Sequence, residues 1–165
     1  MLEEVLERIA ADMHERRGNN TPQGTAESEM PSFPLHQFAG KQLNLMILDK
    51  QITDELVINV LRIIQTEYMH PITLRRLADR LHVSESHLCR VFSKKAGMNL
   101  ILFLNSFRIS LAQMLIDDTN LKIGDIAKMT GFGNSTYFAR LFRKHMSLSA
   151  SEYKQKALRT EDLML

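Results

Sequence analysis

An internal repeat constrains the fold of this chain more than any other feature. Leu88-Cys89-Arg90-Val91-Phe92-Ser93-Lys94 recurs fifty residues later as Phe138-Ala139-Arg140-Leu141-Phe142-Arg143-Lys144. An alanine-centred apolar turn precedes each copy, at Leu74-x-x-Leu77-Ala78 and Ile123-x-x-Ile126-Ala127. A repeat identifies the unit that was duplicated. Here the unit is a short helix, a tight turn and a second helix.

In both copies the second helix places an arginine, Arg90 or Arg140, on the face opposite its apolar residues. Equivalent arginines on two similar helices suit contact with one extended polyanion at two places, which indicates DNA. The net charge of +2 conceals a division along the chain. Residues 71–160 carry fifteen Lys and Arg against six Asp and Glu, whereas residues 1–70 carry six against eleven. Clustered positive charge is typical of nucleic-acid binding.

From Thr53 onward the apolar residues recur at helical spacing, and the first of these helices must end before Pro71. Capping residues then predict the following helices. These are 74–81 capped by Thr73, 85–96 capped by Ser84 and ended by Gly97, a long connecting helix 99–117, 122–130, 135–146 capped by Asn134, and 150–158. Gly131-Phe132-Gly133 forms the second turn. The predicted fold class is all-α: two helix-turn-helix subdomains joined by a long connecting helix, preceded by an N-terminal helix and a linker.

The amino-terminal third has a different character. Residues 1–17 predict an amphipathic helix, a dimerisation or sensor remnant, because Leu2, Val5, Leu6, Ile9 and Met13 form an apolar stripe. Residues 18–50 predict a linker and irregular segment, in which 42–50 stay open between a strand and a short helix. Residues 51–160 are then the DNA-binding domain.

Residues 72–156 resemble the DNA-binding module of the AraC/XylS family of bacterial transcription regulators. The longest match is Ile126-Ala127-x-x-x-Gly131-Phe132-x-x-x-x-Tyr137-Phe138-x-Arg140-x-Phe142-x-Lys144, followed by Ser151-Glu152-Tyr153. The resemblance implies two recognition helices in adjacent major grooves. After the second one, Met146 and Ala150 stand where the family usually has a Gly and a Pro, which leaves the helix end and the angle of the last helix open.

The candidate DNA contacts divide into two sets. The recognition faces and the resemblance predict base contacts from Ser86, His87, Cys89, Arg90, Ser135, Thr136, Ala139 and Arg140. Phosphate contacts are predicted for Thr73, Lys94, Lys95, Lys122, Arg143 and Lys144. Apart from the arginines and His87, the base-contacting side chains are small, so we expect moderate specificity supplemented by DNA shape.

Two further sets of residues receive structural roles. Arg108 lies between apolar neighbours in the connecting helix, which favours an ion pair with Asp79 or Asp125. The aromatic residues at helical spacing are predicted to be core: Phe92, Phe132, Tyr137, Phe138, Phe142 and Tyr153.

Other classes of function find little support. The six His do not combine with carboxylates or thiols at metal-ligand spacing, and neither a phosphate-binding loop nor a nucleophile elbow is present, so we expect no enzyme, metal or cofactor. A single cysteine, Cys89, fits a reducing cytoplasm. The longest apolar run, Leu100 to Leu104, is far shorter than the about 20 residues of a membrane span.

Two hypotheses remain. The first is a sequence-specific transcription regulator, an activator in kind, with double-stranded DNA and RNA polymerase as partners and a homodimer through residues 2–17. The second is a protein-interaction module that modulates another regulator or the polymerase, with DNA binding secondary. An interaction module would need an exposed apolar patch where a DNA-binding protein gathers Arg90, Lys94, Arg140 and Lys144.

Overall fold

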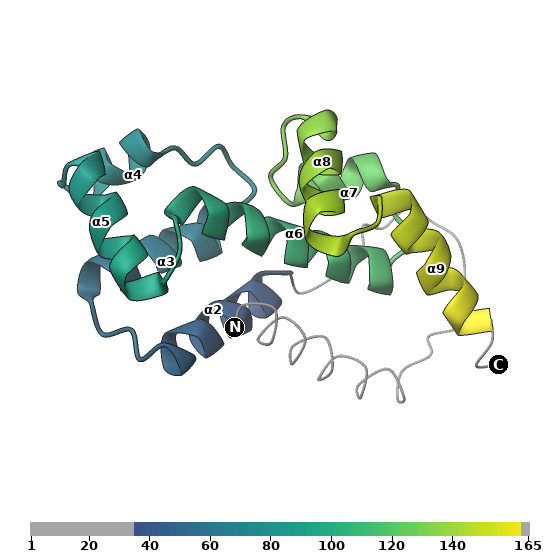
Figure 1. The fold of residues 1–165 in the computed structure, drawn as a ribbon, viewed down its shortest axis with the longest axis horizontal. Helices are drawn as coiled ribbons and strands as arrows, with labels where there is room; N and C mark the ends of the chain where they lie inside the picture. Colours follow the sequence, from purple (N-terminus) through teal and green to yellow (C-terminus); the bar gives the residue numbers. More distant parts are fainter. Residues whose placement is uncertain (1–34, 163–165) are drawn as a thin grey trace.

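The computed structural model describes residues 35–162, and every regular element within them is a helix. The helices are α2 (Leu35–Asp49), α3 (Glu55–Glu67), α4 (Leu74–Arg80), α5 (Glu85–Ala96), α6 (Leu100–Asp118), α7 (Ile123–Met129), α8 (Ser135–Met146) and α9 (Ala150–Asp162). Figure 1 shows α6 running through the middle, with α4 and α5 at one end and α7 and α8 at the other. The all-α class with two helix-turn-helix units and a connecting helix is confirmed.

Side-chain caps set most of these helix boundaries. The Thr73 hydroxyl accepts from the Arg76 amide at 3.2 Å, the Ser84 hydroxyl from the His87 amide at 3.2 Å, and the Asn134 side chain from the Tyr137 amide at 2.8 Å. Gly97 ends α5 with φ of 76°, a conformation that costs glycine little. The caps predicted for α4, α5 and α8 are therefore confirmed.

The connecting helix α6 is buried on most of its surface because it supplies core to both units. It packs on α5 at one end and on α7, α8 and α9 at the other. Near its first turns the Phe103 ring lies 5.5 Å from Phe92 of α5, and the Phe107 ring lies 5.9 Å from Tyr68. By length and apolar composition α6 could span a membrane, but 78% of that window is buried inside the protein, as in a core helix.

Helix α2 corrects part of the prediction for residues 18–50. Residues 35–41 were expected to be linker and 42–50 stayed open between a strand and a short helix, whereas Leu35–Asp49 is one helix that packs on α3. Its inner face consists of Ala39, Leu43 and Met46, all buried at the spacing of one helical stripe. The Gln42 side chain also donates to the Ser110 hydroxyl of α6 at 2.7 Å. The stripe was missed because adjacent apolar residues on the outer side, Leu45 and Leu48, blur its periodicity.

The junction between α8 and α9 is built without the Gly and Pro that the resemblance leads us to expect. Ser147, one residue after the expected position at Met146, ends α8 in the left-handed region with φ of 57°. Ser149 and Glu152 then start α9 as a capping box, because the Ser149 amide donates to the Glu152 carboxylate at 2.7 Å and the Glu152 amide to the Ser149 hydroxyl at 3.2 Å. These bonds from Ser149 hold the pKa of Glu152 below its usual value.

Arg108 is a second correction. It makes no ion pair with Asp79 or Asp125, but donates from Nε to the Tyr68 carbonyl at 2.9 Å and from Nη2 to the His70 carbonyl at 2.8 Å. Burial lowers the pKa of its guanidinium from the usual value, yet an arginine keeps its charge in proteins. The structural role expected of Arg108 is present, with backbone carbonyls as the partners.

Candidate nucleic-acid interface

Each unit turns between its two helices through a residue with positive φ. In the first unit this residue is His82, with φ of 56°, and in the second it is Gly131, with φ of 88°. The first turn joins α4 to α5 and the second joins α7 to α8, with one more residue in the second turn. The two units therefore present equivalent second helices, α5 and α8, through turns of different sequence.

The predicted base-contacting residues of α5 lie together on its outer surface. Ser86, His87 and Arg90 are exposed and Cys89 is half-buried, whereas Leu88 and Phe92 on the other side are fully buried. Ser86, Cys89 and Arg90 follow the i, i+3, i+4 spacing of one helical face. The N-terminal half of α5 thus offers one polar strip to a partner.

The same arrangement recurs on α8. Ser135, Thr136, Ala139 and Arg140 are all exposed, and Phe138 and Phe142 are buried. Thr136 and Arg140 correspond in register to Ser86 and Arg90 of α5. All eight predicted base-contacting residues therefore lie at the surface of two equivalent helices.

Each recognition arginine has an aromatic partner three residues earlier on its own helix. Arg90 Nη2 lies 3.2 Å from His87 Nδ1, and the Arg140 guanidinium lies 5.4 Å from the centre of the Tyr137 ring. His87 and Tyr137 occupy equivalent positions of the repeat. The Arg140 guanidinium is attracted by the π face of the Tyr137 ring, whereas Arg90 meets a ring nitrogen of His87. These contacts orient both arginines and assign His87 a place beside Arg90.

Tyr137 corrects the prediction that all six aromatic residues are core. Its side chain is 37% exposed, while its hydroxyl accepts a hydrogen bond at 3.0 Å from the side chain of Asn105, a buried residue of α6. Of the other five, Phe92, Phe132, Phe138 and Phe142 are buried, and Tyr153 is half-buried against the core. Tyr137 therefore connects the recognition face to α6, a role that helical spacing alone does not reveal.

The predicted phosphate-contacting side chains are also exposed. They are Thr73, Lys94, Lys95, Lys122, Arg143 and Lys144. Lys94 and Lys144 follow Arg90 and Arg140 by four residues, one helical turn further along each helix. The Thr73 hydroxyl accepts from the Arg76 amide, so the cap occupies one of the amides at the helix N-terminus that were expected to meet phosphate.

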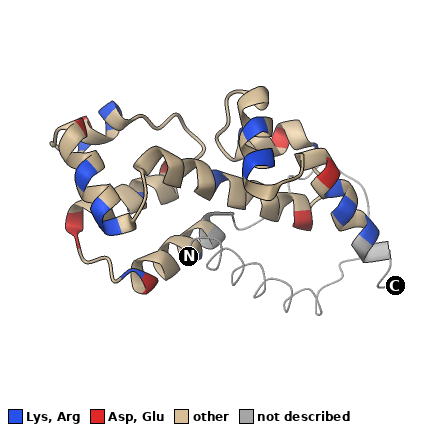
Figure 2. Cartoon of the chain, in the orientation of Figure 1, with Lys and Arg blue, Asp and Glu red and all other residues tan. Residues whose placement is uncertain are grey.

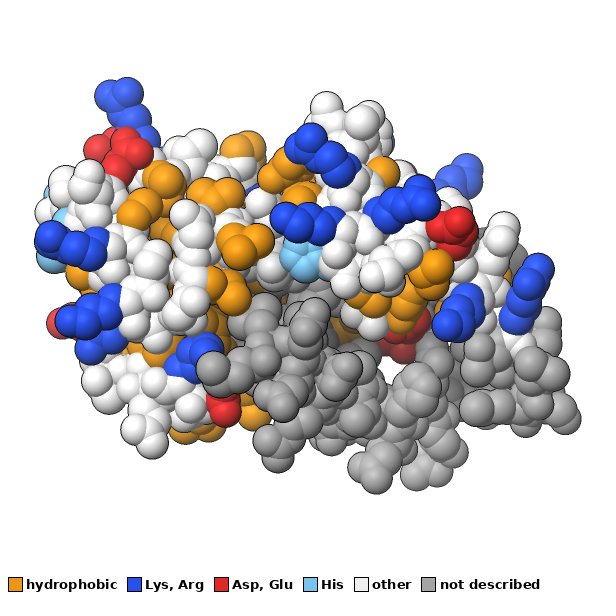
Figure 3. Space-filling model, viewed as in Figure 1, with side chains coloured by type: hydrophobic (Ala, Val, Ile, Leu, Met, Phe, Trp, Pro, Cys, Tyr) orange, Lys and Arg blue, Asp and Glu red, His pale blue; other side chains and the backbone are white. Residues whose placement is uncertain are grey.

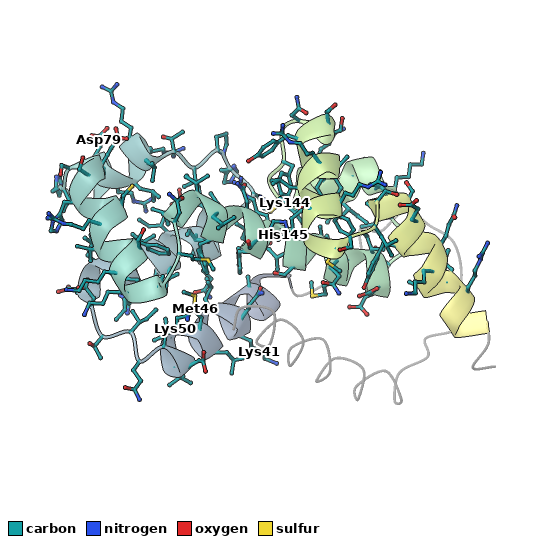
Figure 4. All side chains as sticks on the ribbon, viewed as in Figure 1. Lys41, Met46, Lys50, Asp79, Lys144 and His145 are labelled. Carbon is teal, nitrogen blue, oxygen red and sulfur yellow. The ribbon has the colours of Figure 1, made fainter. Side chains whose placement is uncertain are left out.

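The basic side chains of both recognition helices share one side of the molecule. Figure 2 shows Lys and Arg positions along α5 and α8 in the same view, and Figure 3 shows the same side in space-filling form, with basic side chains over both units and hydrophobic ones between them. In Figure 4, Lys144 lies beside His145 at the end of α8. His145 Nε2 lies 2.9 Å from the Ser106 hydroxyl of α6, so this histidine joins α8 to α6.

Sequence reasoning missed a second group of cations on the first unit. Thr73, Arg75, Arg76, Asp79 and Arg80 line a shallow, open depression on α4. Arg80 also pairs with Glu67, and this hydrogen bond lowers the pKa of the Glu67 carboxyl. The sequence signal for this group is Arg75-Arg76 at the start of α4.

Metal chemistry has no geometric support within the part of the chain that the structure describes. No group of three or more His, Cys, Asp or Glu in residues 35–162 could hold a metal ion. Cys89, the one cysteine of the sequence, is a free half-buried thiol on α5. The arrangement is suited to contacts with a polyanion along two helices.

Residues 77–156 match the family model of a helix-turn-helix domain. The chain is 29% identical over 93 residues to the HTH-type transcriptional regulator YpdC of Escherichia coli K12, covering 56% of this chain and 33% of that protein. It is 32% identical over 107 residues to the bifunctional transcriptional activator and DNA repair enzyme AdaA of Bacillus subtilis, covering 65% of this chain and 51% of AdaA. The chain thus spans between about an eighth and about half of such relatives.

Solved structures resemble the same region. The C-terminal domain of AraT, a response regulator from Geobacillus stearothermophilus, superposes with a TM-score of 0.61 at 29% identity, covering 62% of this chain and 86% of that one. A probable AraC family transcriptional regulator from Rhodopseudomonas palustris gives a TM-score of 0.56 at 26% identity, covering 63% of this chain and 98% of that one.

Proposed function

Residues 77–156 form a helix-turn-helix domain of the AraC type, and from this premise we propose that the protein is a sequence-specific DNA-binding transcription regulator. In this proposal α5 and α8 enter adjacent major grooves of one duplex, and one chain binds an asymmetric site. The relatives named above support the proposal, since they are transcription regulators, one of them also a DNA repair enzyme.

The observation that carries the proposal is the duplicated surface of α5 and α8. Both helices expose an arginine beside small polar residues, with a lysine one turn further on. Figure 3 shows basic side chains over both units on the same side of the molecule. Arginine suits guanine because its fork reaches O6 and N7 together. The lysines fit phosphates, which set position without sequence information. We expect the two helices to lie about 34–36 Å apart, one turn of B-DNA.

The proposed contacts assign roles residue by residue. Ser86, His87, Cys89, Arg90, Ser135, Thr136, Ala139 and Arg140 contact base edges, while Thr73, Lys94, Lys95, Lys122, Arg143 and Lys144 contact the phosphate backbone. The Arg75, Arg76 and Arg80 cluster on α4 adds positive charge on the first unit. No residue in this set has a catalytic role in the proposal, and the protein acts in the cytoplasm.

Selection from a pool of randomised duplexes with the wild-type chain tests this function. We expect one asymmetric motif to be enriched. Arg90→Ala and Arg140→Ala should each weaken binding to the selected duplex by about 1–3 kcal/mol, and each should relax preference in one half of the motif. Arg159→Ala is the matched control, because Arg159 is exposed in the last turn of α9 and belongs to neither recognition helix.

The outcome that contradicts base recognition is equally clear. If both arginine variants bind selected and random duplexes as tightly as the wild type, these residues do not contact bases. If the wild type enriches no duplex, the protein-interaction module becomes the better description.

Two further parts of the proposal concern partners. We propose a homodimer through residues 2–17, which lie outside the described residues, and activation through contact with RNA polymerase. Sedimentation of the full chain beside a chain starting at Leu35 tests the dimer, because α2 is part of the folded body and must be kept. Loss of a dimer on truncation supports the proposal. A monomer throughout, with tighter DNA binding after truncation, would indicate autoinhibition by the amino-terminal residues instead.

A further inference from the structure

Three parts of the chain that are distant in sequence meet around the Arg108 side chain. Arg108 belongs to α6, and its guanidinium binds the carbonyls of Tyr68 and His70 in the connection between α3 and α4, at 2.9 and 2.8 Å. The same guanidinium lies 5.9 Å from the centre of the Phe132 ring, in the turn of the second unit. One side chain of the connecting helix therefore contacts both the connection that leads into the first unit and the turn of the second unit.

At the same place, Gly131 brings the turn of the second unit close to the backbone between α3 and α4. A Cβ atom on Gly131 would lie 2.1 Å from the Tyr68 carbonyl oxygen and 2.9 Å from Arg108 Nε, both too close for a real side chain. The turn of the second unit therefore lies directly against a carbonyl in the connection between α3 and α4, and α3 packs on α5 of the first unit. Gly131 also has φ of 88°, so any other residue there is strained.

Arg108 has a physical reason to hold this geometry. The residue is only 8% exposed, and a buried charge is costly unless it is hydrogen-bonded. Its Nε and Nη2 donors point in fixed directions because the guanidinium is rigid and planar. Rotation of one unit about α6 would separate the guanidinium from its two carbonyls and leave buried polar groups unpaired.

We propose that Arg108 is a positioning residue that locks the two helix-turn-helix units at one relative orientation, with Gly131 providing the close approach. The lock fixes the spacing and phase of α5 and α8. In its DNA consequence this inference rests on the proposed function. Two modules held at a matched geometry bind more tightly than either alone by about 10²–10⁴-fold, and that gain is lost when the geometry does not fit.

The orientation can be measured without DNA. Spin labels at Ser93→Cys on α5 and Lys128→Cys on α7, in a Cys89→Ser background, report the distance between the units by pulsed electron paramagnetic resonance; Ser93 and Lys128 are both exposed. We expect one narrow distance distribution in the parent, and a broader or second distribution in Arg108→Met and in Gly131→Ala. Ile126→Val, a conservative change in the buried core of the second unit, is the control and should stay narrow. An unchanged narrow distribution in a folded Arg108→Met protein overturns the lock.

Arg108→Lys serves as a second variant if the Arg108→Met protein does not fold. It keeps the charge but replaces the planar fork with a single ammonium, so we expect an intermediate width. Thermal unfolding of each variant identifies the folded ones. If Arg108→Lys is folded and as narrow as the parent, charge alone explains the site and the fork is not needed.

The DNA arm uses the duplex selected by the wild type and two derivatives with one and two base pairs inserted between its halves. We expect insertion to weaken wild-type binding by more than about tenfold, and Arg108→Met to bind the parent duplex less tightly while losing much less on insertion. A purely structural defect would weaken binding to all three duplexes by the same factor, and that result overturns the DNA consequence. If the wild type selects no duplex, the proposed function fails, while the spin-label distances still decide the lock.

Discussion

At the scale of single residues, the recognition arginines depend on neighbours that lie under them. Arg140 contacts the Tyr137 ring, and the Tyr137 hydroxyl in turn accepts from Asn105. The ring attracts and orients Arg140, whereas the hydroxyl joins α8 to α6 through the hydrogen bond with Asn105. The two functions of Tyr137 can therefore be separated by substitution.

We predict that Tyr137→Phe lowers the free energy of unfolding by about 1–2 kcal/mol, because it leaves a buried Asn105 donor without its acceptor. Binding to the selected duplex should stay near the wild-type value, since the ring under Arg140 remains. Tyr137→Leu should lower both the free energy of unfolding and the affinity for the selected duplex. Chemical denaturation and fluorescence anisotropy measure them. A Tyr137→Phe protein of wild-type stability would show that the Asn105 bond contributes nothing.

At the scale of helices, the α8–α9 junction has a left-handed serine where glycine would be less strained. Ser147 has φ of 57°. The Ser149 and Glu152 pair starts α9 independently of this strain. The junction thus holds its angle through side-chain caps, and the strained position can be relieved without changing it.

Ser147→Gly should accordingly stabilise the protein. Removing the Cβ relieves about 1 kcal/mol of strain, part of which is offset by the larger conformational freedom of glycine in the unfolded chain. The control is Gln155→Gly, at an exposed position inside α9, which should destabilise by about 1 kcal/mol. Thermal unfolding of both variants provides the comparison, and equal losses in the two would exclude strain at Ser147.

Helix α2 gives a second prediction at this scale. Leu43 is buried at 2% exposure and Leu48 is 74% exposed on the outer side of the same helix. Leu43→Ala should lower the free energy of unfolding by about 2–5 kcal/mol, and Leu48→Ala should change it by less than about 0.5 kcal/mol. If Leu43→Ala is as mild as Leu48→Ala, α2 does not contribute to the stability of the body.

These helices also show how far the sequence alone could lead. Helices α4, α5 and α8 were predictable to within one residue, because Thr73, Ser84 and Asn134 are local caps and Gly97 is a local stop. Helix α2 was not, since exposed leucines beside its buried stripe disguise the period. Exposure of the candidate site followed from the repeat. The partners of Arg108 and Tyr137 could not be predicted, because each bond joins residues more than thirty positions apart in sequence.

At the scale of the whole molecule, affinity for DNA should depend strongly on salt. The predicted phosphate contacts include five cations: Lys94, Lys95, Lys122, Arg143 and Lys144. If each neutralises one phosphate, the slope of log K against log salt concentration is about −4.5. Lys144→Ala should reduce its magnitude by about 0.9 and weaken binding to selected and random duplexes alike. Titrations at several salt concentrations measure the slope, and an unchanged slope in Lys144→Ala would remove this residue from the phosphate contacts.

The burial of α6 has a consequence for how the protein folds during synthesis. On the ribosome, α3, α4 and α5 emerge before α6. The rings of Phe92 and Tyr68 therefore stay uncovered until Phe103 and Phe107 of α6 have been synthesised. The second unit then packs on the other end of α6, whose first turns already pack on α5 of the first unit. Neither copy of the repeat has a core that closes by itself. Because both copies of the repeat share α6, we expect them to fold as one cooperative body, and cutting the chain between them should yield two incomplete cores instead of two smaller DNA-binding proteins.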